Sequence, residues 1–95
     1  MIATRLRQAR ERKELSQRRL GILAGIHVDS ASSRINQYEH GKHEPDFGTL
    51  ERLAGVLGVP TAYFYAVDDL LAEAILALEK LSESEKRKLI RKLAV

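Results

Sequence analysis

The stretch Ser16–Lys42, SQRRLGILAGIHVDSASSRINQYEHGK, contains two short helical patterns that lie close together. Ser16 is a good helix N-cap, and the apolar residues after it recur at spacings of three and four, as on one helix face. Glycine ends helices readily because it adopts left-handed backbone conformations, and Gly25 and Gly41 follow the two patterns. The stretch therefore predicts two helices joined by a short turn.

Two helices joined in this way form a helix-turn-helix, a motif that lays its second helix in the major groove of DNA. In the second pattern, Ile35 and Tyr38 have the spacing of a core face, and polar side chains occupy the positions between and around them. Short polar side chains on such a helix can reach base edges. The pattern therefore predicts that the chain binds double-stranded DNA.

Length and composition fit one small domain. Ninety-five residues allow a single domain with a modest core, which a dimer would enlarge. The absence of cysteine excludes disulfides and thiolate metal sites, and it is compatible with a reducing cytoplasm. The longest apolar stretch, Leu70–Leu81, is interrupted by Glu73 and Glu79, and Met1–Gln8 has no apolar signal core. We expect a cytoplasmic protein without a membrane segment.

Positive charge is concentrated around the two helices. Residues 1–45 carry nine Lys/Arg and five Asp/Glu, a net charge of +4, whereas residues 46–81 carry −4 and residues 82–95 carry +3. Because phosphate neutralisation supplies most non-specific affinity for DNA, this distribution favours a polyanion bound by the N-terminal half. Basic residues also solvate helix surfaces, and without the motif both interpretations have equal weight.

The apolar periodicity predicts helices almost throughout and no strand, and so an all-α fold. The first helix is expected to end near Lys13, and Asp29 or Ser30 is expected to cap the helix that Gly41 ends. Further helices are expected after Pro45-Asp46, after Pro60, over Leu70–Leu81 and after the capping box of Ser82 and Glu85.

One ordered set of residues indicates a known protein family, although each of its motifs alone also occurs by chance. It comprises Arg10, Leu15-Ser16-Gln17, Leu20, Ala24-Gly25, Ile35, Glu39-His40-Gly41-Lys42, Pro45, Leu50, Leu53-Ala54, Leu57-Gly58-Val59 and Phe64. The set resembles the XRE family, which has the DNA-binding fold of the lambdoid phage repressor and Cro proteins. The resemblance covers residues 1–66 and implies a five-helix, lambda-repressor-like DNA-binding domain there. The apolar spacing and caps predict one or two additional C-terminal helices over residues 67–95, an expected dimerisation segment.

The resemblance also implies roles for single residues. Arg10 and Glu39 match the ion pair that joins the first helix to the recognition helix, and Gln17 matches a donor to phosphate. The implied contacts to base edges are Ser32, Ser33 and Gln37. The chain departs from the family between Gly25 and Ile35, where it has four residues more than usual, with residues 27–30 as the inserted run. Four residues are about one helical turn, so they either lengthen the turn or extend the recognition helix at its N-terminus.

Side-chain chemistry adds further candidates. Asn36 and Gln37 carry amides that pair with adenine, and Arg34 either reads guanine or holds a phosphate. The remaining phosphate candidates are Arg18, Lys42 and His43. A polar residue on an exposed helix or loop is often only solvated, and the motif favours contact most clearly for Gln37, Arg34 and Lys42.

A catalytic or metal site has little support. His40 and His43, with His27 as a distant third ligand, imitate a metal site, but the first two straddle the end of a helix and Glu39 already has Arg10 as a partner. The sequence has neither a phosphate-binding glycine loop nor a nucleophile elbow. We expect no enzymatic activity, no metal and no cofactor.

The segment Leu70–Leu81 has an apolar face wider than one small domain needs. A second copy of the chain can cover this face, or a different protein can, as in antitoxins whose DNA-binding module carries a toxin-binding segment. The segment is capped and leucine-rich, which favours the homodimer. The predicted dimer contacts are Leu70, Ala74, Ala77 and Leu81, whereas Leu71, Ile75 and Leu78 are expected to pack on their own domain.

These observations predict a sequence-specific transcriptional regulator that binds a palindromic operator as a homodimer. Repression by occlusion is the expected mode of action, because the sequence shows no separate activating or effector-binding domain. The alternative is an antitoxin-type protein whose C-terminal helices bind a partner protein.

Overall fold

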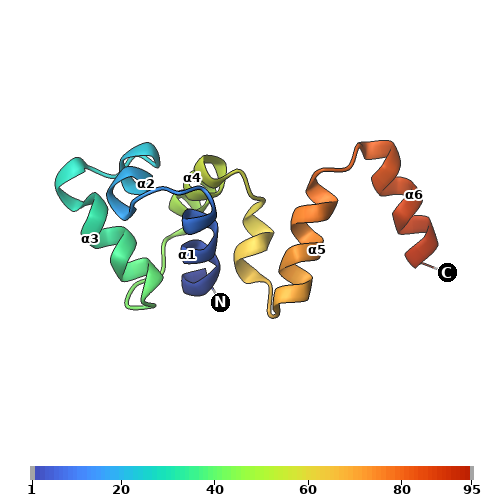
Figure 1. The fold of residues 1–95 in the computed structure, drawn as a ribbon, viewed down its shortest axis with the longest axis horizontal. Helices are drawn as coiled ribbons and strands as arrows, with labels where there is room; N and C mark the ends of the chain where they lie inside the picture. The colour runs from blue at the N-terminus through green and yellow to red at the C-terminus, as the bar shows by residue number, and fades with distance from the viewer. Residues whose placement is uncertain (1, 95) are drawn as a thin grey trace.

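The computed structural model describes residues 2–94 and is helical throughout, with no strand in that range. Its elements are α1 (Ile2–Arg12), α2 (Gln17–Leu23), α3 (Val28–Glu39), α4 (Phe47–Leu57), the 3-10 helix η1 (Thr61–Tyr65), α5 (Asp69–Glu79) and α6 (Glu83–Leu93). The molecule is elongated, 51 × 23 × 22 Å, with α3 near one end and α6 at the other (Figure 1). The predicted all-α fold is confirmed, and of the one or two additional C-terminal helices expected, the structure has two, α5 and α6.

Most of the core lies within the first five helical elements, and Ala72 of α5 joins it. Its largest fully buried side chains come from α1, α2, α3, α4 and η1: Leu6, Leu20, Ile35, Leu50, Leu53, Leu57, Tyr63 and Phe64. Tyr63 and Phe64 meet edge to face, with ring centroids 5.8 Å apart. This single cluster holds α2 and α3 against α1 and α4, so the helix-turn-helix rests on a continuous apolar base.

Short side-chain caps set most helix boundaries. Asp46 accepts a hydrogen bond from the Thr49 N–H at 2.8 Å and so begins α4, and Gly58, with φ +68°, ends it. The same hydrogen bond from the Thr49 N–H lowers the pKa of the Asp46 carboxyl. Ser82 and Glu85 form the predicted capping box of α6.

Helix α5 packs on the domain with a different face from the one predicted. Ala72 is buried and Ile75 and Leu76 are partly buried against the core, whereas Leu71 and Leu78 are 45% and 38% exposed. The prediction placed Leu71, Ile75 and Leu78 inward because residues three and four apart share a helix face. Of these three, Ile75 packs against the core, whereas Leu71 and Leu78 turn outward and the small Ala72 is buried on the side of α5 that contacts η1.

An ion pair anchors the start of α5. The buried Arg5 side chain donates to Asp69 at 2.7 Å and to the carbonyl oxygen of Ala66 at 3.3 Å. The predicted dimer residues Leu70, Ala74 and Ala77 are exposed on the outer side of α5, and Leu81 lies just beyond its end, half-buried. Among residues 2–94, no helix has the length and apolar character needed to cross a membrane.

Candidate nucleic-acid interface

Helices α2 and α3 cross at a point where there is no room for a larger side chain. A Cβ atom added to Gly21 would lie 2.8 Å from Ala31 Cβ and 3.0 Å from the Ala31 backbone, which is closer than real contacts allow. Gly25, with φ +87°, then turns the chain after α2. This close approach of α2 and α3 therefore requires glycine at position 21.

The structure corrects the predicted start of α3. The helix begins at Val28 and its cap is His27, whose Nδ1 accepts a hydrogen bond from the Asp29 N–H at 3.1 Å, so the predicted caps Asp29 and Ser30 lie inside the first turn. The imidazole of His27 is the acceptor in place of the expected carboxylate of Asp29 or hydroxyl of Ser30. The extra residues 27–30 therefore cap and extend the recognition helix at its N-terminus, and they do not lengthen the turn.

One face of α3 is buried and the opposite face is open. Ala31, Ile35, Tyr38 and Glu39 are buried. All five predicted base-contact residues are exposed: Ser32, Ser33, Arg34, Asn36 and Gln37. By the helical period, Ser33, Asn36 and Gln37 share the outermost face, whereas Ser32 and Arg34 flank it.

The sequence pattern alone does not select one further groove-facing candidate. The exposed Asp29 lies four residues before Ser33 on the same outer face, whereas Val28 lies on the face of Ala31 and Ile35 although it is 44% exposed at the first turn. A carboxylate can accept a hydrogen bond from cytosine. The spacing of Asp29 to Ser33 is visible in the sequence, but the same residue is also a predicted cap.

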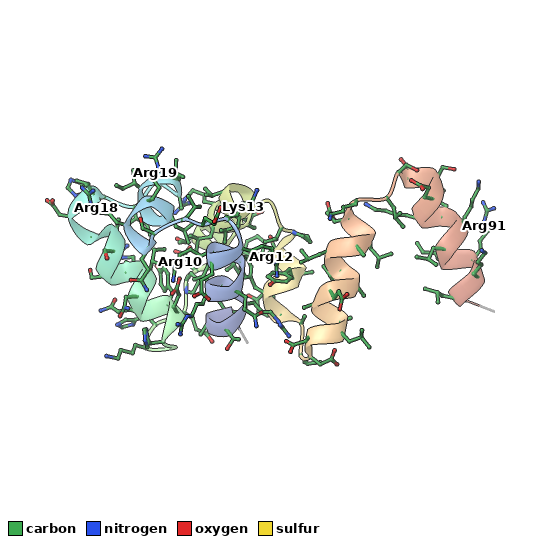
Figure 2. The ribbon with its side chains drawn as sticks, viewed as in Figure 1. Arg10, Arg12, Lys13, Arg18, Arg19 and Arg91 are labelled. Carbon is green, nitrogen blue, oxygen red and sulfur yellow. The ribbon has the colours of Figure 1, made fainter. Side chains whose placement is uncertain are left out.

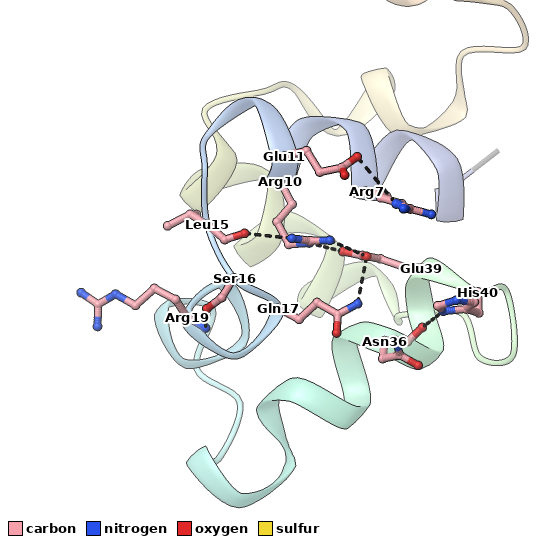
Figure 3. A network of polar contacts seen from close by, with 10 residues as sticks. All are labelled: Arg7, Arg10, Glu11, Leu15, Ser16, Gln17, Arg19, Asn36, Glu39 and His40. Atoms are coloured by element: carbon pink, nitrogen blue, oxygen red, sulfur yellow. Dashed lines mark hydrogen bonds and ion pairs between the residues drawn. The ribbon is translucent and has the colours of Figure 1, made fainter.

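The predicted ion pair between Arg10 and Glu39 is present in the structure (Figure 3). Arg10 donates from Nε to Glu39 Oε2 at 2.5 Å and from Nη2 to Oε1 at 3.0 Å, and its Nη1 donates to the carbonyl oxygen of Leu15 at 2.9 Å. The two side chains are 14% and 1% exposed. The hydrogen bond to Glu39 raises the pKa of Arg10 further above its ordinary value, against the opposing effect of burial. The pair links α1, the α1–α2 turn and the end of α3.

The predicted phosphate contacts occupy different environments. Arg18, Lys42 and His43 are exposed at the start of α2 and in the loop after α3. Gln17 is half-buried, and its Nε2 donates to Glu39 Oε1 at 3.1 Å (Figure 3). One amide proton of Gln17 therefore joins α2 to the buried ion pair, which leaves the other for a phosphate.

Basic side chains of α2 lie at the same end of the molecule as α3. Arg18 and Arg19 both project from α2, at the end of the molecule that holds α3, and Arg91 lies at the opposite end (Figure 2). Arg19, which sequence analysis did not select, is exposed and points away from the ion-pair network (Figure 3). Within residues 2–94, no group of three or more His, Cys, Asp or Glu side chains is placed to hold a metal ion.

Comparisons with known proteins agree with this geometry. Residues 2–63 match the family described as Helix-turn-helix domain. The SPbeta prophage-derived uncharacterized HTH-type transcriptional regulator YonR of Bacillus subtilis (strain 168) is 38% identical over 63 residues, which are 66% of this chain and 55% of YonR. The chain thus spans about half the length of that relative.

A solved structure extends the similarity to the C-terminal helices. The crystal structure of transcriptional regulator BswR aligns with a TM-score of 0.88 and 47% sequence identity, over 99% of this chain and 93% of that one. At this coverage the alignment includes both α5 and α6.

Proposed function

Since this chain belongs to the helix-turn-helix domain family and is a transcriptional regulator with a DNA-binding domain, we propose that it represses transcription as a homodimer on a palindromic operator. It acts by binding alone, without catalysis, in the cytoplasm. A dimer that covers a promoter excludes other proteins from the same DNA, so occlusion needs no further chemistry.

The observation that carries this proposal is the rigid presentation of the polar face of α3. Its core side is fixed by the contact of Gly21 with Ala31 and by the ion pair of Arg10 with Glu39. Its outer side offers Ser33, Asn36 and Gln37, whose side chains can bond to base edges. A rigid helix with such an outer face is suited to reading sequence, and the basic residues around it are suited to holding the backbone.

The homodimer is supported by the apolar surface outside the DNA-binding domain. Leu70 on α5 is 75% exposed, and Ile90 and Leu93 on α6 are 62% and 74% exposed. Two-fold dimers of helix-turn-helix proteins bind inverted half-sites whose centres are separated by about one DNA turn or a multiple of it. A dimer built through α5 and α6 leaves both copies of α3 free for DNA.

The same apolar surface favours a second candidate, an antitoxin-type protein whose C-terminal helices bind a different protein. The mass of the purified chain in solution separates the two candidates. A stable dimer at micromolar concentration supports the homodimer. A monomer whose apolar surface is covered only after a second protein is added supports the antitoxin.

Selection of bound fragments from random DNA tests the proposed function. We expect one enriched motif that forms an inverted repeat, with half-site centres about 10 to 10.5 base pairs apart or a multiple of that spacing. Enrichment of an asymmetric single site would contradict the homodimer on a palindrome. Absence of any enriched sequence would contradict sequence-specific binding.

A further inference from the structure

Helix α6 is well capped but packs little against the other described residues of the chain. None of its residues is buried, and it stands apart from α5 at the end of the long axis (Figure 1). Its apolar residues Leu89, Ile90 and Leu93 lie at spacings that define one face. An isolated helix of 11 residues is marginal in water, so α6 needs a surface to cover that face.

Helix α5 offers such a surface. Its inner face packs on the domain through Ala72 and Leu76. Its outer face, which we define as Leu70, Leu71, Ala74, Ala77 and Leu78, is exposed. Both helices are 11 residues long, so the outer face of α5 matches the apolar face of α6 in length.

Charge decides which helix pairs with which. Helix α5 carries Asp69, Glu73 and Glu79 with no basic residue, a net charge of −3. Helix α6 has five basic and two acidic residues, a net charge of +3. An α5–α5 or α6–α6 contact between copies brings like charges together, whereas an α5–α6 contact brings opposite charges together.

We propose that α6 of each chain packs on the outer face of α5 of a second copy, so that two chains exchange their C-terminal helices. The proposal rests on the homodimer proposed above and names its contact. The short connection at residues 80–82 directs α6 away from its own α5, so the partner's α5 is the surface within its reach. Reciprocal exchange forms two identical α5–α6 pairs about one two-fold axis, and both lie away from α3.

Cysteine cross-linking in the full-length chain tests the exchange, because the chain has no cysteine of its own. The variant Ala74→Cys/Ile90→Cys places one thiol on the outer face of α5 and one on the apolar face of α6. It is treated with a short bismaleimide, and its products are identified by denaturing electrophoresis and peptide mass. Ala74→Cys/Lys88→Cys is the matched control, since Lys88 lies opposite the apolar face of α6.

We expect a covalent dimer linked between residue 74 of one chain and residue 90 of the other, at a yield at least about tenfold above the control. A link between residues 74 and 90 of the same chain would overturn the exchange, as would efficient linkage of the single variant Ala74→Cys to itself. Sedimentation of the unmodified protein keeps the two proposals distinguishable. A dimer without the 74–90 link between chains overturns the exchange alone, whereas a monomer overturns the homodimer and the exchange together.

Discussion

Removal of Glu39 should destabilise the domain strongly, because its carboxylate is the acceptor at the centre of the ion-pair network. Glu39 accepts two hydrogen bonds from Arg10 and one from Gln17, and its side chain is only 1% exposed. Loss of one partner of a buried ion pair costs about 3 to 5 kcal/mol, whereas loss of an exposed one costs at most about 1 kcal/mol.

The structure places Glu39→Ala at the lower end of the buried range. The Arg10 side chain is 14% exposed and also donates to the Leu15 carbonyl oxygen, so without Glu39 its guanidinium would lose only part of its hydrogen bonds. We therefore expect a loss of about 3 kcal/mol in the free energy of unfolding, or roughly 12 to 24 °C in Tm for a domain of this size.

Urea unfolding followed by far-ultraviolet circular dichroism is the appropriate assay, since the chain has no tryptophan. Glu11→Ala is the matched control. Its pair with Arg7 spans 3.6 Å, and the two side chains are 57% and 60% exposed, so we expect a change of at most about 0.5 kcal/mol. If Glu39→Ala is too unstable to measure, Glu39→Gln retains the shape and one acceptor. An unfolding free energy for Glu39→Ala within about 1 kcal/mol of wild type would refute the interpretation that Arg10 and Glu39 form a stabilising buried ion pair.

Three further predictions concern the fold and the dimer. Gly21→Ala should destabilise the domain in thermal unfolding because the added Cβ would lie 2.8 Å from Ala31 Cβ. Gly55→Ala in α4, where an added Cβ has nothing within 4 Å, should instead stabilise the domain by about 1 kcal/mol. A change in unfolding free energy of the same sign for both variants would contradict the close crossing of α2 and α3. The lowered pKa of Asp46 means that its carboxylate stabilises the fold above the unfolded pKa near 3.8 and loses this effect as pH falls through the folded pKa. In urea unfolding, the free energy of unfolding of wild type should exceed that of Asp46→Asn by a constant amount above about pH 5, and this difference should shrink toward about pH 2. A difference that does not change with pH would contradict the stabilising role of the Asp46 carboxylate. Ala77→Lys, which places a positive charge on the exposed outer face of α5, should give a folded monomer in sedimentation because that face would then meet the basic α6 of the other copy. An intact dimer would place the interface elsewhere.

Local sequence signals predicted the elements that local chemistry determines. Ser16, Asp46 and Ser82 cap their helices through their own side chains, so adjacent residues were sufficient to place those boundaries. The pairing of Arg10 with Glu39 spans 29 positions and no periodicity indicates it; it came from the resemblance to the XRE family.

Features that depend on packing between distant segments were not predictable. The rotation of α5 that buries Ala72 and exposes Leu71 depends on its contact with η1, and a wide apolar pattern alone does not choose between neighbouring faces. The start of α3 is not predictable from the sequence because histidine is not a common N-cap, yet in the structure the ring nitrogen of His27 accepts the hydrogen bond from the Asp29 N–H. The bond from Gln17 to Glu39 likewise required the relative positions of α2 and α3.

The central claim, that the outer face of α3 reads bases, is tested most directly by the ratio of affinities for the selected operator and for random DNA. For Gln37→Ala, whose side chain is exposed on that face, we predict that operator binding weakens by about 1 to 3 kcal/mol while random-DNA binding is unchanged. Lys42→Ala, the matched control in the following loop, should weaken both equally and reduce the slope of log affinity against log salt by about one unit. An unchanged ratio for Gln37→Ala would contradict the claim.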